Sequence, residues 1–283
     1  MDYEHILFDV ADGVATITLN RPERRNAWTR GMGIEIRDAL MVADERDDVR
    51  AIVVTGAGRD FCVGADLEGG GTVFERARAE ETGGGPRLTL KAWDIRKPII
   101  AALNGAVAGV GATLPLQWDI RLAGESTRIG FVFVRRGLVP EAASTWTLPR
   151  IIGMSRAAEL LLTGRLVNAR EALEYGLVSR VVPDAELVST AQAMARDIAT
   201  QTAPVAVALT KRLLWRFTGE NDPEAAEHLD AQVFGWTTQS PDAKEGIRAF
   251  LDKRTPQWTM SATTDLPDLD CMPPAGQPAK KKP

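Results

Sequence analysis

The chain has 283 residues, 45% of them hydrophobic and 25% charged, with a formal net charge of −4, which gives no reason to expect nucleic acid as a partner. Its two cysteines, Cys62 and Cys271, fit no metal-ligand spacing, and its two histidines leave little room for histidine-centred chemistry. No segment has the pattern of a signal peptide, and no apolar run approaches the ~18 residues of a membrane span, so we expect a cytoplasmic protein without membrane contact.

The first hundred residues alternate between strand and helix patterns, which predicts an α/β fold with parallel pairing. The expected elements are a hairpin of residues 6–10 and 14–19, a helix from Thr29 to about Ala43, buried strands at 51–55 and 99–103, and a helix at 87–96. Residues 68–86 hold two glycine triplets and read either as a lid or as a plain solvated loop.

The second half of the chain is mainly helical in pattern. Helices are expected at 155–162, after the Asn168–Glu171 capping box, at 184–199, at 206–217, and from Ser240-Pro241 onward. We therefore expect a core of residues 1–200, a C-terminal helical oligomerisation region of residues 201–258, and a disordered tail of residues 259–283.

Two glycine-rich turns can each aim a backbone N–H group at one point: Gly64-Ala65-Asp66, and Gly109-Val110-Gly111 at the expected start of a helix. A helix start of this kind suits an anion or a developing oxyanion. Each signal is weak alone, because most such turns only redirect the chain, and the second lacks the Gly-Lys-Ser/Thr of a phosphate loop. Asp66 reads more readily as a structural cap than as a catalytic acid, and Pro115 predicts a kink in the helix.

Glu141 is a lone carboxylate that follows Pro140 in an apolar, glycine-rich segment. It can be an exposed residue at a helix start or an acid/base group in a catalytic site. No acid pair at close helical spacing supports a glycosidase or a metal hydrolase. The pattern favours one oxyanion-stabilising turn combined with one acid/base glutamate.

Six segments stand in order over roughly residues 5–256: Ile17–Ala27, Val54–Leu67, Ala102–Gly111, Ala158–Arg165, Ala172–Val178 and Glu245–Lys253. Together they resemble the crotonase (enoyl-CoA hydratase/isomerase) superfamily. Each motif is loose, but the combination and its spacing are specific. The resemblance implies a spiral of ββα units, a C-terminal helical region that builds trimers or dimers of trimers, and an acyl-CoA substrate, with no cofactor beyond the coenzyme A of the substrate and no metal.

The resemblance also implies roles for individual residues. The N–H groups of Ala65 and Val110 would form an oxyanion hole, and Glu141 would be the catalytic acid/base. The residues expected along coenzyme A are Arg24, Arg25, Ala27, Gly64, Ala65, Asp66, Leu67 and, from the last helix of a neighbouring subunit, Phe250 and Lys253. The acyl pocket is expected to include Thr113, Phe133 and Trp93.

Departures from the family pattern narrow the reaction. The two glutamates with which classical hydratases add water correspond to Thr113 and Phe133 here, and neither can move a proton in that scheme. The run from Val139 to Gly153 resembles peroxisomal-type Δ3,Δ2-enoyl-CoA isomerases, in which one glutamate carries a proton between C2 and C4. Aryl-CoA dehalogenases place an aspartate there but also use a histidine, which this region lacks.

Double-bond isomerisation is therefore the first expectation. Enoyl-CoA hydration and a non-catalytic acyl-CoA binding or scaffold role remain as alternatives. A base needs a pKa near the working pH, and apolar neighbours would raise the pKa of Glu141 if they surround it. The neighbours expected to do so are Phe131, Phe133, Val139 and Ala142.

Overall fold

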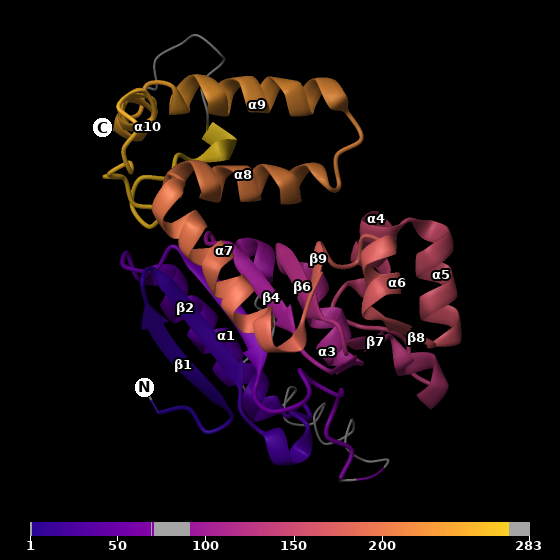
Figure 1. The fold of residues 1–283 in the computed structure, drawn as a ribbon. Helices are drawn as coiled ribbons and strands as arrows, with labels where there is room; N and C mark the ends of the chain where they lie inside the picture. The colour runs from indigo at the N-terminus through magenta and orange to yellow at the C-terminus, as the bar shows by residue number, and fades with distance from the viewer. Residues whose placement is uncertain (1, 69, 71–90, 272–283) are drawn as a thin grey trace, which may run out of the picture.

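A computed structural model describes residues 2–68, 70 and 91–271 of the protein. Within them, a large sheet has the strand order β1-β2-β3-β4-β6-β9 and a small sheet has the order β5-β7-β8 (Figure 1). The strands are β1 (Ile6–Ala11), β2 (Val14–Leu19), β3 (Ala51–Gly56), β4 (Ile99–Leu103), β5 (Ala106–Ala108), β6 (Ile120–Gly124), β7 (Arg128–Gly130), β8 (Leu166–Asn168) and β9 (Arg180–Val182). Only the β1–β2 pair of the large sheet is antiparallel, so the expected hairpin and the α/β class with parallel pairing are confirmed.

The helices of the described residues lie around the two sheets. They are α1 (Arg30–Glu45), α3 (Val110–Thr113), α4 (Ser144–Ile152), α5 (Met154–Thr163), α6 (Ala169–Glu174), α7 (Leu187–Gln201), α8 (Pro204–Phe217), α9 (Pro223–Thr237) and α10 (Pro241–Leu251). In Figure 1, α4, α5 and α6 cluster beside the small sheet, α7 crosses the large sheet, and the α8–α9 hairpin projects away from it. No helix in the described part of the chain is long and apolar enough to cross a membrane.

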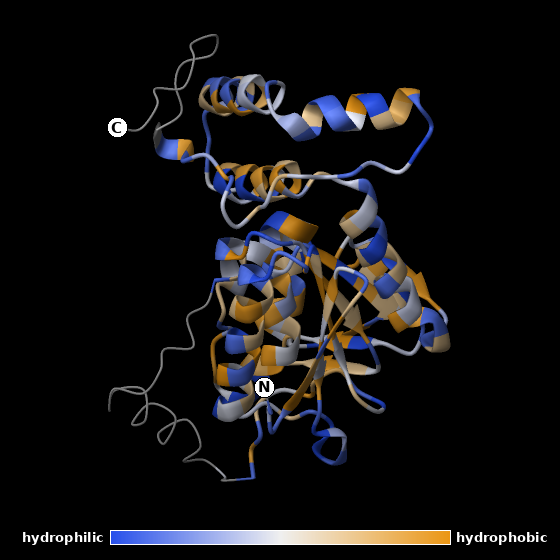
Figure 2. Ribbon diagram, turned by 90° about the vertical axis from the view of Figure 1, so that its left-hand side faces the viewer, coloured by the Kyte–Doolittle hydropathy of each residue, from blue (hydrophilic) through white to orange (hydrophobic). Residues whose placement is uncertain are grey.

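The large sheet is covered on both faces because successive side chains of a strand point to opposite sides. Ile52 and Val54 of β3 pack in the cluster that includes the apolar stripe of α1. Ala51 and Val53 pack in the cluster that includes α7. Figure 2 shows these strands as a mostly hydrophobic layer between helices of mixed character. This two-sided burial explains the continuous apolar run of β3.

Local capping signals fixed several helix starts. The Thr29 hydroxyl accepts a hydrogen bond from the Met32 N–H at 3.1 Å, and Asn168 and Glu171 form the expected capping box. The Ser240 hydroxyl caps α10. In contrast, the helix expected at 87–96 is only a 3-10 turn over Ala92–Asp94 where it is described. Most of the glycine-rich 68–86 segment lies outside the described residues.

The expectation of a disordered tail from residue 259 is wrong for residues 259–271, and residues 272–283 lie outside the described part. Met260, Leu266 and Leu269 pack against the apolar cluster between α8 and α9. The Asp242 carboxylate accepts hydrogen bonds from the N–H groups of Thr259 at 2.9 Å and Met260 at 3.3 Å. The polar composition of this segment concealed apolar residues that are spaced to reach one groove.

A buried ion pair ties α8 to the sheet. The Lys211 ammonium lies 2.7 Å from the Asp119 carboxylate, which also accepts a 2.7 Å hydrogen bond from the Ile99 N–H at the start of β4. Lys211 further donates to the Lys97 carbonyl at 2.8 Å. Its side chain is 5% exposed, so desolvation lowers its pKa while Asp119 acts in the opposite direction.

Candidate active site

Two backbone segments from different parts of the chain run parallel to form the centre of the site. Cys62 and Val107 form a parallel bridge, in which the Cys62 N–H donates to Ala106 at 3.2 Å and the Ala108 N–H donates to Cys62 at 2.9 Å. Two residues beyond this bridge on both segments, Gly64 lies beside Gly109. Three residues beyond it, the same register places Ala65 level with Val110.

This close approach requires glycine. Gly64 has φ +100°, and a Cβ there would lie 3.2 Å from the Ala108 carbonyl oxygen. A Cβ on Gly111 would lie 2.4 Å from the Cys62 carbonyl oxygen, which no side chain can accept. These glycines therefore allow the two backbone segments to approach closely, and they also allow the chain to turn.

The N–H groups of Ala65 and Val110 are both available at this point. Val110 is the first residue of α3, so its N–H has no partner within the helix. In the described part of the chain, neither N–H donates a backbone hydrogen bond. Both residues line a cavity of about 180 Å³, whose other walls are Trp28, Val63, Gly64, Leu67, Gly109, Val132, Phe133, Arg136, Leu138 and Glu141.

Glu141 is the one acidic side chain among the residues that line this cavity. Its Oε1 accepts a hydrogen bond from the Thr113 hydroxyl. Thr113 is fully buried at the end of α3, the helix that begins with Val110. One short helix thus presents the Val110 N–H at its first residue and holds the Glu141 carboxylate from its last.

The backbone after Glu141 is strained. Ala142 and Ala143 have φ values of +54° and +56°, a region that costs an L-residue about 1–2 kcal/mol. The Gln117 amide holds the turn by donating to the Ala142 carbonyl at 2.9 Å. Strained residues of this kind cluster at functional sites, and here the turn sets the direction of Glu141 and begins α4.

Burial raises the pKa of Glu141 above the ordinary glutamate value, and the Thr113 hydrogen bond partly opposes the shift. By surface area Glu141 is an exposed residue, but the protein atoms packed around its carboxyl group displace part of the water that would solvate the charge. The predicted set of apolar neighbours needs correction. Val139 is 81% exposed and Phe131 lies in the main core, whereas Phe133 and Leu138 line the cavity.

Two of the residues expected along coenzyme A, Arg24 and Asp66, form a charged rim with Arg21 and Glu68 beside the cavity-lining residues Ala65 and Leu67. Arg24 lies 2.6 Å from Glu68 and 3.4 Å from Asp66, and Arg21 lies 3.0 Å from Asp66. Desolvation opposes ionisation of Asp66, but hydrogen bonds from the Glu68 N–H and the two arginines lower its pKa overall. Asp66 is therefore a structural link between the 21–24 turn and the 64–68 loop, as its sequence suggested.

Arg25 is engaged in a different contact. It lies 2.7 Å from Asp60, which is 4% exposed and accepts a 2.8 Å hydrogen bond from the Ala106 N–H. Ala27 is buried, and its carbonyl accepts a 2.6 Å hydrogen bond from the Arg21 guanidinium. Arg25 and Ala27 thus stabilise the loop beside the cavity.

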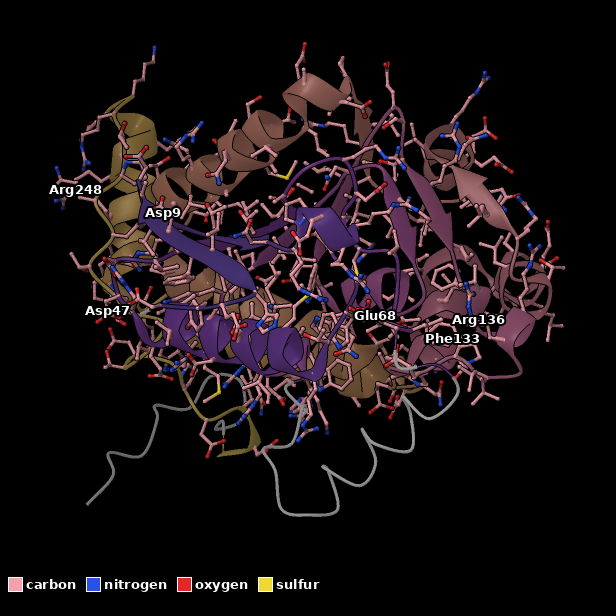
Figure 3. The ribbon with its side chains drawn as sticks, turned by 90° about the horizontal axis from the view of Figure 1, so that it is seen from below. Asp9, Asp47, Glu68, Phe133, Arg136 and Arg248 are labelled. Atoms are coloured by element: carbon pink, nitrogen blue, oxygen red, sulfur yellow. The ribbon has the colours of Figure 1, made fainter. Side chains whose placement is uncertain are left out.

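Three predicted site residues lie away from the cavity within this chain. Phe250 is 82% exposed on α10, and Lys253 follows the end of that helix. Figure 3 shows Arg248 of α10 at one end of the molecule and Phe133 and Arg136 toward the other, with Glu68 between them. Trp93 lies in a different cavity, where its ring centroid is 5.2 Å from that of Trp215.

The structure adds residues that the sequence did not indicate. Trp28 lines the cavity because it bridges Ala65: its N–H donates to Gly64 at 2.8 Å and its carbonyl accepts from Asp66 at 2.9 Å. Its position directly after the Arg24–Ala27 motif was a usable signal. The sequence carried no comparable signal for Gln117 or Arg136. No group of acidic, histidine or cysteine side chains among the described residues is arranged to hold a metal ion.

Comparison with known proteins gives a consistent result. The family model "Enoyl-CoA hydratase/isomerase" matches residues 9–261. Enoyl-CoA hydratase ACTT3 of Alternaria alternata is 42% identical over 88% of this chain and 83% of its own length. The 1,2-epoxyphenylacetyl-CoA isomerase of Escherichia coli strain K12 is 36% identical over 90% of this chain and 98% of its own.

Solved structures agree with this match. A probable enoyl-CoA hydratase/isomerase from Mycobacterium abscessus superimposes with a TM-score of 0.81 at 39% identity, covering 92% of this chain and 99% of the other. An enoyl-CoA hydratase from Bacillus anthracis gives a TM-score of 0.82 at 35% identity, covering 90% and 99%. The expected crotonase-like fold is confirmed.

Proposed function

Because the chain belongs to the enoyl-CoA hydratase/isomerase family, we propose that it isomerises the double bond of enoyl-CoA thioesters with Glu141 as the single proton carrier. The observation that carries this proposal is that Ala65 and Val110, whose N–H groups donate no backbone hydrogen bond among the described residues, line one cavity together with a single carboxylate. Thr113 and Phe133 occupy the positions at which hydratases are expected to place their glutamates. Phe133 cannot transfer a proton, and Thr113 is occupied as a donor to Glu141.

The reaction follows from this arrangement. The ionised Glu141 removes a proton from C2 of a 3-enoyl-CoA, and the electron pair delocalises onto the thioester oxygen. The N–H groups of Ala65 and Val110 stabilise that oxyanion, and loss of one such donor typically costs about 3–4 kcal/mol of barrier. The protonated Glu141 returns its proton to C4, so that the double bond moves to C2–C3. Its raised pKa makes it both a stronger base and an adequate acid near neutral pH.

The charged rim gives coenzyme A a place beside the cavity. Arg24 is 37% exposed and can exchange its contact with Glu68 for a phosphate oxygen. Phe250 and Lys253 lie too far away to reach this cavity from their own chain. We therefore assign them to the nucleotide end of a site in a neighbouring subunit, within a trimer or a dimer of trimers.

Hydration of 2-enoyl-CoA is the second candidate. Three of the relatives whose matches cover most of this chain are named enoyl-CoA hydratase. A water activated by Glu141 could add to C3, but protonation of C2 would then need the same carboxyl group or a second donor. A protein that only binds acyl-CoA is the third candidate.

The test follows the absorbance of the conjugated thioester. Wild-type protein is mixed separately with a 3-enoyl-CoA and a 2-enoyl-CoA of medium chain length. We expect absorbance to rise with the 3-enoyl substrate, to be lost in Glu141→Gln and to persist in Glu125→Gln, which alters an exposed carboxylate after β6. A fall with the 2-enoyl substrate alone would instead identify a hydratase, and no change with either substrate would contradict both enzyme proposals.

A further inference from the structure

A second cavity, of about 800 Å³, has tryptophan walls and lies next to the turn that carries Glu141. Trp93, Trp146 and Trp215 line it, together with Ala143. The Trp93 and Trp215 ring centroids are 5.2 Å apart and their planes are inclined by 40°. The proton transfer proposed above uses none of these side chains.

The Glu141–Ala143 turn separates the two cavities. Glu141 faces the smaller one and Ala143 faces the larger one, and two residues span at most about 7 Å. The Gln117 side chain connects both sides, because its Nε2 donates to Ala142 at 2.9 Å and its Oε1 accepts from Ala92 at 3.5 Å. The two cavities therefore lie on either side of this turn, within the length of a few acyl carbons of each other.

The tryptophan rings are held before any ligand enters. The Trp215 indole N–H donates to Asp119 at 3.4 Å, and Lys211 holds that carboxylate in turn. Trp146 lies in the first turn of α4, with the Arg150 guanidinium 4.1 Å from its ring centroid. Preset aromatic faces favour a planar ring, because offset or edge-on ring pairs add about 0.5–1.5 kcal/mol beyond the burial of area. A straight alkyl chain gains only the free energy of burying its apolar surface, without the contribution of ring pairing.

Charge does not select the ligand strongly. Carboxylates and guanidinium groups both line the cavity, and one pair of them, Arg216 and Asp270, lies 2.8 Å apart. Neither an anionic nor a cationic tail has a clear advantage there.

We propose that this cavity binds the distal end of the acyl group and that the preferred acyl group carries an aromatic ring. The inference rests on the proposed function, which places the thioester carbonyl at Ala65 and Val110. It also gives Trp93 the acyl-binding role expected from the sequence, in a chamber beyond the one that holds Glu141.

Binding of saturated thioesters tests this inference separately from catalysis. Isothermal titration calorimetry compares 4-phenylbutanoyl-CoA with decanoyl-CoA, which has the same number of acyl carbons and the same coenzyme. We expect the phenyl compound to bind roughly three- to tenfold more tightly. The preference should disappear in Trp93→Ala and Trp215→Leu, and persist in Trp258→Leu, which alters a tryptophan that donates to Thr200 instead.

Equal affinities in the wild type would overturn the inference, as would a preference that survives both cavity variants. Circular dichroism and gel filtration show whether each variant keeps its fold and assembly, and Trp93→Phe restores a ring if Trp93→Ala does not fold. A protein that prefers the phenyl compound but does not isomerise enoyl-CoA would refute the proposed function and leave this inference standing. An isomerase that shows no preference for the phenyl compound would support the proposed function and refute this inference.

Discussion

Glu141 combines an elevated pKa with a fixed orientation, which depend on burial, on one neighbour distant in sequence and on the turn that directly follows it. Burial supplies the elevation, and Thr113, 28 positions earlier, supplies a donor to one carboxylate oxygen. Ala142 and Ala143 hold the left-handed turn that aims the side chain. The sequence allowed the prediction that a glutamate occupies this site. It did not allow a prediction of which apolar side chains surround Glu141 and raise its pKa, because the exposure of Val139 depends on how the turn packs.

The first prediction concerns pH. Glu141 acts as a base only when ionised, so activity falls as the pH drops through its folded pKa, which lies above the ordinary glutamate value. Thr113→Val removes the hydrogen bond that favours the carboxylate, so the pKa should rise further and the acidic limb of kcat/KM should move to higher pH. Thr113→Ser keeps the hydroxyl and should keep the wild-type profile. An unchanged limb in Thr113→Val would show that this hydrogen bond does not tune the base.

The second prediction separates the Val110 N–H from its side chain. Val110 is the first residue of α3, a position at which proline is tolerated. Val110→Pro removes the proposed oxyanion donor and should lower kcat by roughly 10²–10³-fold. Val110→Ala keeps the N–H and should stay within a few-fold of wild type. Normal turnover by the proline variant, with the fold checked by circular dichroism, would disprove the oxyanion assignment.

At the scale of elements, local signals were sufficient wherever a cap or a turn acts within a few residues. The Ala11–Gly13 turn, the Thr29 cap and the Asn168–Glu171 box each mark an element that the structure contains. Helix α4 could not be predicted in this way, since it begins after two left-handed alanines and contains Pro149. Helix α9 did carry a usable signal in Asp222-Pro223, a cap followed by proline at the first position.

The third prediction concerns the attachment of α8. Lys211→Met leaves the Asp119 carboxylate without its buried cation, and breaking such a pair typically costs about 3–5 kcal/mol of unfolding free energy. Urea unfolding should show this loss, and Lys211→Met combined with Asp119→Asn should recover part of it. Arg170→Met breaks an exposed pair within α6 and should change stability by no more than about 0.5 kcal/mol. A similarly small change in Lys211→Met would mean that the pair does not anchor the helix.

At the scale of the whole molecule, the fold brings together segments that no local pattern connects. The 62–65 loop and the β5–α3 turn meet along a parallel backbone contact, and Glu141 reaches them from a third segment. The fold class and the meeting of the two glycine-rich turns could be predicted because their motifs resemble a known family. The separation of Trp93 from the Glu141 cavity could not, because it depends on how α4 and α8 pack against the 92–94 turn.

The most direct test of the single-carboxylate mechanism is the mass of the product formed in ¹⁸O-labelled water. The protein is incubated with a 2-enoyl-CoA and, separately, with a 3-enoyl-CoA, and the thioesters are analysed by mass spectrometry and by the position of the double bond. One carboxylate that moves a proton between C2 and C4 predicts interconversion of the two isomers with no gain of mass and no ¹⁸O. A 3-hydroxyacyl-CoA that carries ¹⁸O as the main product would contradict that account and would identify a hydratase that works without glutamates at positions 113 and 133.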